Sequence, residues 1–265
     1  MNLSNGMGAT GDPPEEIIVC HDPEDLGRQA SVSFIRFAQE AVSLRGRFSV
    51  ALAGGATPGT LYRSLASAAF SEEIPWKSVH LFWGDERAVP PDHPDSNYRM
   101  ADEALISHVP IPSENVHRMP GERSDLQAAA MEYEEALRIF FKPSEERWPS
   151  FDLILLGIGS DGHTASLFPG SPVLRETVRW VAAPYVEKLK AARFTLTLPV
   201  LNHARRVIFL VAGKEKAPIM REVLSANPPL TDLPARLVQP RKGGRLFFLD
   251  QEAAGLIEQE EKDCG

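Results

Sequence analysis

The chain has 265 residues, of which 43% are hydrophobic and 24% charged, so it has enough apolar material for a sizeable core. Its formal net charge of −8 argues against a nucleic-acid partner, because such proteins carry basic surface patches. The two cysteines lie near opposite ends of the chain, which excludes a disulfide framework and predicts a reducing cytoplasm, and no apolar run approaches the ~18 residues of a membrane span.

The N-terminal segment is rich in glycine, proline and polar side chains, so we expect residues 1–14 to form a disordered tail. It has no basic start followed by an apolar core, unlike a secretory signal. Residues 15–265 contain no internal repeat or low-complexity linker and are predicted to form one domain.

Apolar runs alternate with amphipathic segments along the rest of the chain. Several runs are apolar without alternation, as in strands buried on both faces of a parallel sheet. The predicted strands are 16–20, 48–53, 79–83, 153–156, 178–186, 193–198, 207–212, 236–238 and 246–249. The predicted helices include 22–44, 97–107, 125–141 and 251–262, the last capped by Asp250.

A glycine turn follows the strand 48–53. Gly54 and Gly55 precede Thr57, which suits a helix N-cap, and Pro58, which suits the first helical position. Free N–H groups at such a turn are a common phosphate site, although a tight turn without a ligand would have the same sequence pattern.

Charged residues follow the strand 79–83 directly, in the order Gly84, Asp85, Glu86, Arg87. A solvated turn would be the plain alternative. Their place at the carboxyl end of a predicted parallel strand favours a ligand site, because ligands of such sheets bind there.

The strand 153–156 ends in a glycine-rich turn that carries Asp161 and His163. Its Gly-x-Gly-x-x-Gly spacing matches a dinucleotide fingerprint. However, Pro169 and Pro172 leave room for only about one helical turn after it, and Glu176 follows no apolar strand. We therefore expect no nicotinamide or flavin.

Two lysines, at 214 and 216, follow the strand 207–212 at the start of a helix. Cations oppose the helix dipole there, so an anionic ligand would offset the penalty; two solvated lysines are the alternative. Since parallel strands end at one edge, all these segments are expected to meet there and to hold a phosphorylated small molecule.

Five segments together resemble the 6-phosphogluconolactonase family, and they cover about residues 48–257 in order. The segments are LAGGATPGTLYRSL, FWGDERAVPPDHPDSNY, FDLILLGIGSDGHTASLFPG, VIFLVAGKEKA and FFLDQEAAGLI. The resemblance implies a Rossmann-like three-layer α/β fold and hydrolysis of 6-phosphoglucono-δ-lactone in the pentose phosphate pathway, without metal or organic cofactor. Ala53 and Ala56 stand where that family often has serines.

The chemistry of a lactone gives these residues roles. We expect His163 to be the general base, since a histidine's unperturbed pKa of about 6.5 lies near working pH. Either Asp161 or Glu86 would orient it. The expected substrate-binding residues are Gly54, Gly55, Thr57, Asp85, Arg87, Arg193 and Lys214.

Two other functions are alternatives. A glucosamine-6-phosphate deaminase resembles this family at the Asp-Gly-His turn but places a carboxylate five residues after the histidine, where this chain has Phe168. A non-catalytic sugar-phosphate sensor would normally be joined to a DNA-binding motif, and no basic segment of that kind precedes Glu16. The oligomeric state stays open, a monomer included.

Overall fold

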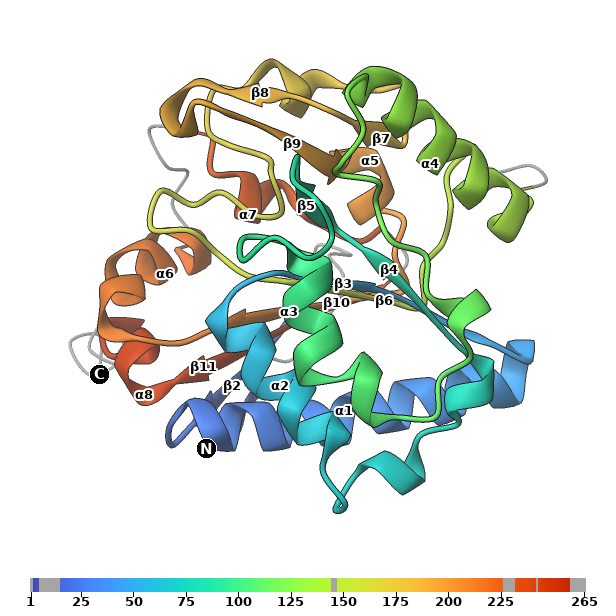
Figure 1. The fold of residues 1–265 in the computed structure, drawn as a ribbon. Helices are drawn as coiled ribbons and strands as arrows, with labels where there is room; N and C mark the ends of the chain where they lie inside the picture. The colour runs from blue at the N-terminus through green and yellow to red at the C-terminus, as the bar shows by residue number, and fades with distance from the viewer. Residues whose placement is uncertain (1, 5–14, 144–146, 226–231, 242, 258–265) are drawn as a thin grey trace.

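A seven-stranded sheet forms the centre of the protein in a computed structural model, which describes residues 2–4, 15–143, 147–225, 232–241 and 243–257 (Figure 1). Neighbouring strands are parallel, except that β1 and β2 are antiparallel. In spatial order the strands are β1 (Asn2–Ser4), β2 (Glu15–Cys20), β11 (Gly244–Asp250), β10 (Arg206–Val211), β6 (Leu153–Leu156), β3 (Phe48–Leu52) and β4 (Val79–Trp83).

The middle strands are mostly apolar because both faces of the sheet are covered. Every residue of β3 and β6 is buried. Figure 1 shows α1, α2 and α3 on one face and α4 and α5 on the other. The α-helices are α1 (Pro23–Arg45), α2 (Ala56–Ala66), α3 (Asn97–Ala104), α4 (Leu126–Phe141), α5 (Leu198–Leu201), α6 (Ala217–Leu224), α7 (Pro234–Leu237) and α8 (Gln251–Ala254).

A second, smaller sheet is antiparallel and lies beyond the carboxyl end of β4 (Figure 1). It consists of β5 (Asp85–Arg87), β9 (Ala191–Leu196), β7 (Val181–Ala182) and β8 (Tyr185–Val186). The predicted strand 178–186 is therefore two short strands, interrupted at Pro184, which has no N–H to donate to a ladder.

Short 3-10 helices make up many of the connections. They are η1 (Ser71–Glu73), η2 (Trp76–Ser78), η3 (Ile106–His108), η4 (Ser113–Asn115), η5 (Pro172–Arg175), η6 (Glu187–Leu189) and η7 (Lys214–Lys216). None of the described helices has the length and apolar character needed to cross a membrane.

The predicted fold class, a mostly parallel sheet between helices in a single α/β domain, is confirmed. The predicted strand 236–238 is wrong: α7 occupies residues 236 and 237, and Val238 is its C-cap. The short apolar run there does not distinguish strand from helix, and Pro234 takes the first helical position that a proline favours.

At the chain ends, three residues of the expected disordered tail form β1, which pairs with β2. Residues 1 and 5–14 lie outside the described residues, as do residues 258–262 of the predicted last helix and Cys264. Asp250 caps α8 as predicted, because its side chain accepts a hydrogen bond from the N–H of Ala253.

Candidate active site

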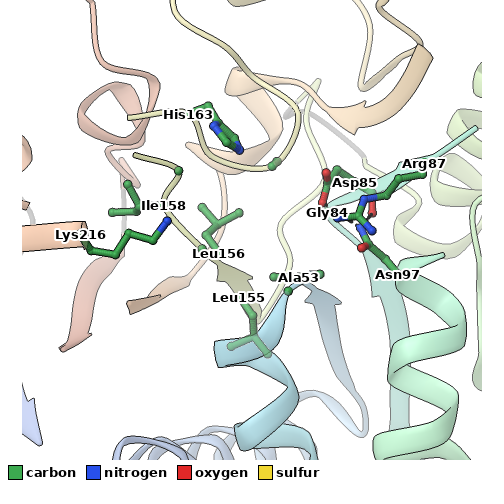
Figure 2. A pocket seen from close by; sticks show the side chains of 15 residues that line it. Ala53, Gly84, Asp85, Arg87, Asn97, Leu155, Leu156, Ile158, His163 and Lys216 are labelled. Carbon is green, nitrogen blue, oxygen red and sulfur yellow. Dashed lines mark hydrogen bonds between the residues drawn. The ribbon is translucent and has the colours of Figure 1, made fainter. Parts of the chain in front are cut away.

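Four chain segments meet at the carboxyl edge of the parallel sheet, as the sequence predicts. They follow β3, β4, β6 and β10, and together they line a cavity of about 240 Å³. In Figure 2, Lys216 approaches this cavity from one side, Asp85 and Arg87 approach from the other, and His163 lies above it. A second cavity of about 200 Å³ shares Asp85, Arg87, His163 and Ala165 with the first.

His163 is held by the carboxylate of Asp161, not by Glu86. The Nδ1 atom of His163 lies 2.5 Å from Oδ1 of Asp161, and Oδ2 of Asp161 forms an ion pair with Lys188 Nζ at 2.8 Å. Partial burial raises the pKa of the Asp161 carboxyl, but the hydrogen bonds from Lys188 and His163 outweigh it, and the pKa falls well below its usual range.

This contact fixes which imidazole nitrogen is available for chemistry. An ionised carboxylate only accepts hydrogen bonds, so Nδ1 of His163 carries the proton and Nε2 of the neutral ring keeps a lone pair. Gly159 makes room for the ring, since any side chain there would overlap it. On another side the ring stacks on Phe168, with centroids 4.3 Å apart.

Glu86 faces away from His163. Its carboxylate accepts hydrogen bonds from the backbone N–H groups of Asn97 and Tyr98, at 2.7 and 2.8 Å, at the start of α3. It also accepts one from Ser96 Oγ at 3.1 Å, and its residue is 2% exposed. Burial raises its pKa, while these amides act in the opposite direction. Glu86 therefore anchors α3, and of the two carboxylates expected to orient the imidazole only Asp161 contacts it.

The glycine turn after β3 differs from the predicted one in detail. Helix α2 begins at Ala56, and its N-cap is Gly55, at a φ of 107° that a residue with a side chain rarely adopts. Thr57 therefore lies inside the first helical turn, and it does not line either cavity. Gly54 and Gly55 line the larger one, beside first-turn N–H groups that have no side-chain cap.

The lysine that lines the cavity is Lys216, whereas Lys214 is exposed. Both belong to η7, a 3-10 turn with about three residues per turn, so residues two apart point in different directions. The structure thus places Lys216, and not the predicted Lys214, at the cavity. Sequence spacing identified the pair of lysines, but only the geometry of the turn selects one of them.

Two further residues of the site were missed. Asn97, which is 1% exposed, donates from Nδ2 to the backbone oxygen of Asp85 at 2.9 Å and lines the larger cavity. Lys188, which pairs with Asp161, follows β8 more than twenty positions along the chain from His163, so no local motif points to it.

The predicted Asp85 also lines both cavities, and its carboxylate accepts a hydrogen bond from Ser166 Oγ at 2.7 Å.

The predicted arginines both lie at the smaller cavity. Arg87 on β5 and Arg193 on β9 are paired directly in the antiparallel ladder. Arg87 also donates a hydrogen bond to the backbone oxygen of Asp95. Across the described ranges, no group of three or more His, Cys, Asp or Glu side chains is placed to hold a metal ion.

A family model described as glucosamine-6-phosphate isomerases/6-phosphogluconolactonase matches residues 21–248. The chain belongs to this glucosamine-6-phosphate isomerase/6-phosphogluconolactonase family. A relative named 6-phosphogluconolactonase from Synechocystis sp. is 44% identical over 214 residues, which is 81% of this chain and 86% of that protein. All the segments that form the cavity lie within the residues matched by the family model.

Solved structures of family members have the same fold. A 6-phosphogluconolactonase from Trypanosoma cruzi is 34% identical and superposes with a TM-score of 0.79, covering 90% of this chain and 95% of that chain. A monomeric glucosamine-6-phosphate deaminase, 23% identical, gives a TM-score of 0.75 over 91% of this chain and 99% of that one. Both activities thus occur on this fold, and the site must distinguish them.

Proposed function

We propose that this protein is a 6-phosphogluconolactonase, which hydrolyses 6-phosphoglucono-δ-lactone to 6-phosphogluconate in the oxidative pentose phosphate pathway. The observation that carries the proposal is the imidazole of His163, held at Nδ1 by Asp161 beside a cavity that also contains a glycine turn and Lys216. This arrangement supplies a base and an anion site for one small phosphorylated ester.

In the proposed reaction, Nε2 of His163 takes a proton from a water molecule as the water oxygen bonds to C1 of the lactone. The bond between C1 and the ring oxygen then breaks, and His163 returns the proton to that ring oxygen. The acid formed at C1 ionises in water. Asp161 keeps the imidazole in orientation and stabilises its positive charge while the proton is held.

The phosphate is proposed to bind in the larger cavity between the glycine turn and Lys216. Gly54 and Gly55 offer backbone N–H groups at the start of α2, where the helix dipole favours an anion. Lys216 adds a full positive charge, and in Figure 2 its side chain extends toward the cavity. This combination replaces the serine hydroxyls that Ala53 and Ala56 do not provide.

A deaminase is disfavoured by the residue five positions after the histidine. That family's carboxylate at this position assists ring opening, but Phe168 occupies it here and stacks on His163 at 4.3 Å. A sensor without catalysis would have no use for an oriented imidazole. We also propose a cytoplasmic location, with which the buried free thiol of Cys20 is compatible.

The test is a coupled assay for 6-phosphogluconate released above the spontaneous rate, run beside glucosamine 6-phosphate as a competing substrate. We expect turnover of the lactone only, unaffected by a chelator, and a loss of at least about 10²-fold in His163→Ala, as is typical when a general base is removed. His108→Ala is the matched control, because this histidine is exposed on η3 and lines neither cavity.

Turnover of glucosamine 6-phosphate in place of the lactone would favour the deaminase. Binding of sugar phosphates without any turnover would favour the sensor. Unchanged lactone turnover in His163→Ala would remove the histidine from the mechanism.

A further inference from the structure

A groove of about 310 Å³ lies between α1 and the β2 side of the large sheet, and it shares no lining residue with the two cavities at the carboxyl edge. The sheet contributes Ile18 of β2 and Leu246 and Phe248 of β11, all apolar and at most 9% exposed. Ile18 and Phe248 are neighbours in the parallel ladder. The groove therefore has an apolar floor to which the proposed reaction gives no role.

Helix α1 forms the facing wall with a single stripe of side chains. Gln29, Val32, Ser33 and Arg36 follow the i, i+3, i+4, i+7 spacing that places residues on one helix face. The solvent-facing stripe of a surface helix is normally polar, but Val32 is 58% exposed. An exposed valine beside an apolar floor forms a continuous surface whose burial is favourable.

Two opposite charges lie on the two walls of the groove without pairing with each other. Glu16 belongs to the β2 wall and Arg36 to the α1 wall. Over the ranges that the structure describes, neither side chain has a hydrogen-bond or ion-pair partner, and the guanidinium of Arg36 rests over the ring of Phe37 at 4.9 Å. A complementary partner therefore brings a base to Glu16, an acid to Arg36 and an apolar side chain to the floor.

A second copy of this chain carries that same set of groups. A two-fold axis that runs along the groove places the α1 wall of one copy opposite the β2 wall of the other, and such an interface repeats every contact twice. Arg36 of each copy then meets Glu16 of the other. Val32 of each copy lies one helical turn before Arg36, so it meets the apolar floor of the other copy.

We propose that this groove is the contact surface of a weak homodimer, in which Val32 of each copy covers Ile18 of the other beside two Glu16–Arg36 ion pairs. The proposal goes beyond the proposed function, and both catalytic sites stay open in such a dimer because they share no residue with the groove. Stable interfaces bury about 1,200–2,000 Å² of total surface. Since the groove is short, we expect a dissociation constant of about 1–100 μM.

The test is sedimentation equilibrium of the full chain over protein concentrations that span this range. We expect a monomer–dimer equilibrium, and Val32→Asp should raise the dissociation constant at least about tenfold, because it places a carboxylate against an apolar floor. Leu44→Asp is the matched control, since Leu44 is also on α1 and 68% exposed but does not line the groove. It should leave the equilibrium unchanged.

Charge reversal tests the pairing between the two walls. Glu16→Lys alone and Arg36→Glu alone each place like charges together in both pairs, so each should weaken the dimer by about tenfold. The double variant Glu16→Lys/Arg36→Glu exchanges the two charges and should recover most of the lost affinity. Only a contact between these two positions of different copies predicts that recovery.

A monomer throughout the concentration range would overturn the proposal. A dimer that Val32→Asp leaves intact, or whose affinity the double variant does not recover, would also overturn it, because the contact would then lie elsewhere on the surface. Thermal unfolding midpoints within about 2 °C of the unsubstituted protein, expected for exposed positions, show that lost association is not lost folding. If Val32→Asp does not fold, the charge-reversal variants decide alone.

Discussion

Both edges of the parallel sheet carry a cavity, a carboxylate and several cations, but they are arranged in opposite ways. At the amino edge, Asp152 is 5% exposed and its oxygens are occupied. Oδ2 accepts from the N–H and the hydroxyl of Ser49, both at 2.8 Å, and Oδ1 accepts from Arg45 Nε at 2.9 Å, with Arg205 at 3.5 Å. The cations here neutralise a buried acid.

At the carboxyl edge the charges are not matched in this way. Arg87 faces Arg193, and Asp161 holds an imidazole whose second nitrogen has no such partner among the described residues. The amino-edge cavity has a volume of about 440 Å³, which exceeds the 240 Å³ of the cavity beside His163 at the carboxyl edge. Size therefore does not identify the site. Charges satisfied within the fold indicate stability, and charges left for a ligand indicate function.

Among the substitutions that test this contrast, Asp161→Asn should have the largest effect, and the effect should be on turnover. The amide keeps the shape of the side chain but no longer stabilises a protonated imidazole and allows the wrong tautomer of His163. We expect kcat to fall by about 10²–10⁴-fold, with little change in the free energy of unfolding. The measurement is lactone turnover together with urea denaturation. A stability loss as large as the catalytic one would mean that Asp161 is structural.

The matching substitution at the amino edge, Asp152→Asn, should lower stability and leave turnover almost unchanged. It leaves the cations of Arg45 and Arg205 without their buried counter-charge, which we expect to lower the free energy of unfolding by about 2–4 kcal/mol while kcat stays within twofold. Urea denaturation and the same turnover assay check this. A strong loss of turnover in a folded Asp152→Asn protein would break the contrast between the two edges.

The sequence predicted most of the fold, because its buried strands are apolar on both faces and end in clear turns. The unbroken run Leu153–Leu156 and the imidazole ten residues after its start were found for this reason. The directions of single side chains could not be predicted in the same way. Glu86 remained a candidate for orienting His163 because it follows the strand 79–83 beside Asp85 and Arg87, whereas its side chain turns to α3.

Contacts between distant segments could not be predicted either. Lys188 reaches Asp161 only because the small antiparallel sheet returns the chain over the site, and no spacing rule connects the two positions. Asn97 packs against Gly54, where any side chain would overlap it, so that glycine serves a neighbour as well as a ligand. Both contacts are consequences of tertiary packing, and neither residue type is unusual for its own segment.

The smallest expected effect tests whether Lys188 belongs to the functional edge. Lys188→Met removes a positive charge next to Asp161, so the pKa of Asp161 should rise toward its ordinary value. Proton uptake by the His163–Asp161 pair then becomes easier, and the acid limb of the kcat/KM profile should move to higher pH. Because the lysine side chain is 66% exposed, we expect only a few tenths of a pH unit and a loss of about 3–10-fold in kcat.

The sign of this shift separates the alternatives. A lysine that merely supports the loop would lower activity equally at every pH, whereas a lysine that holds the carboxylate changes the profile most on its acid side. Lys190→Met is the control, since this residue is exposed, lies two positions along the same loop and lines neither cavity. An acid limb that stays in place in Lys188→Met, or that moves equally in Lys190→Met, would exclude Lys188 from positioning the catalytic pair.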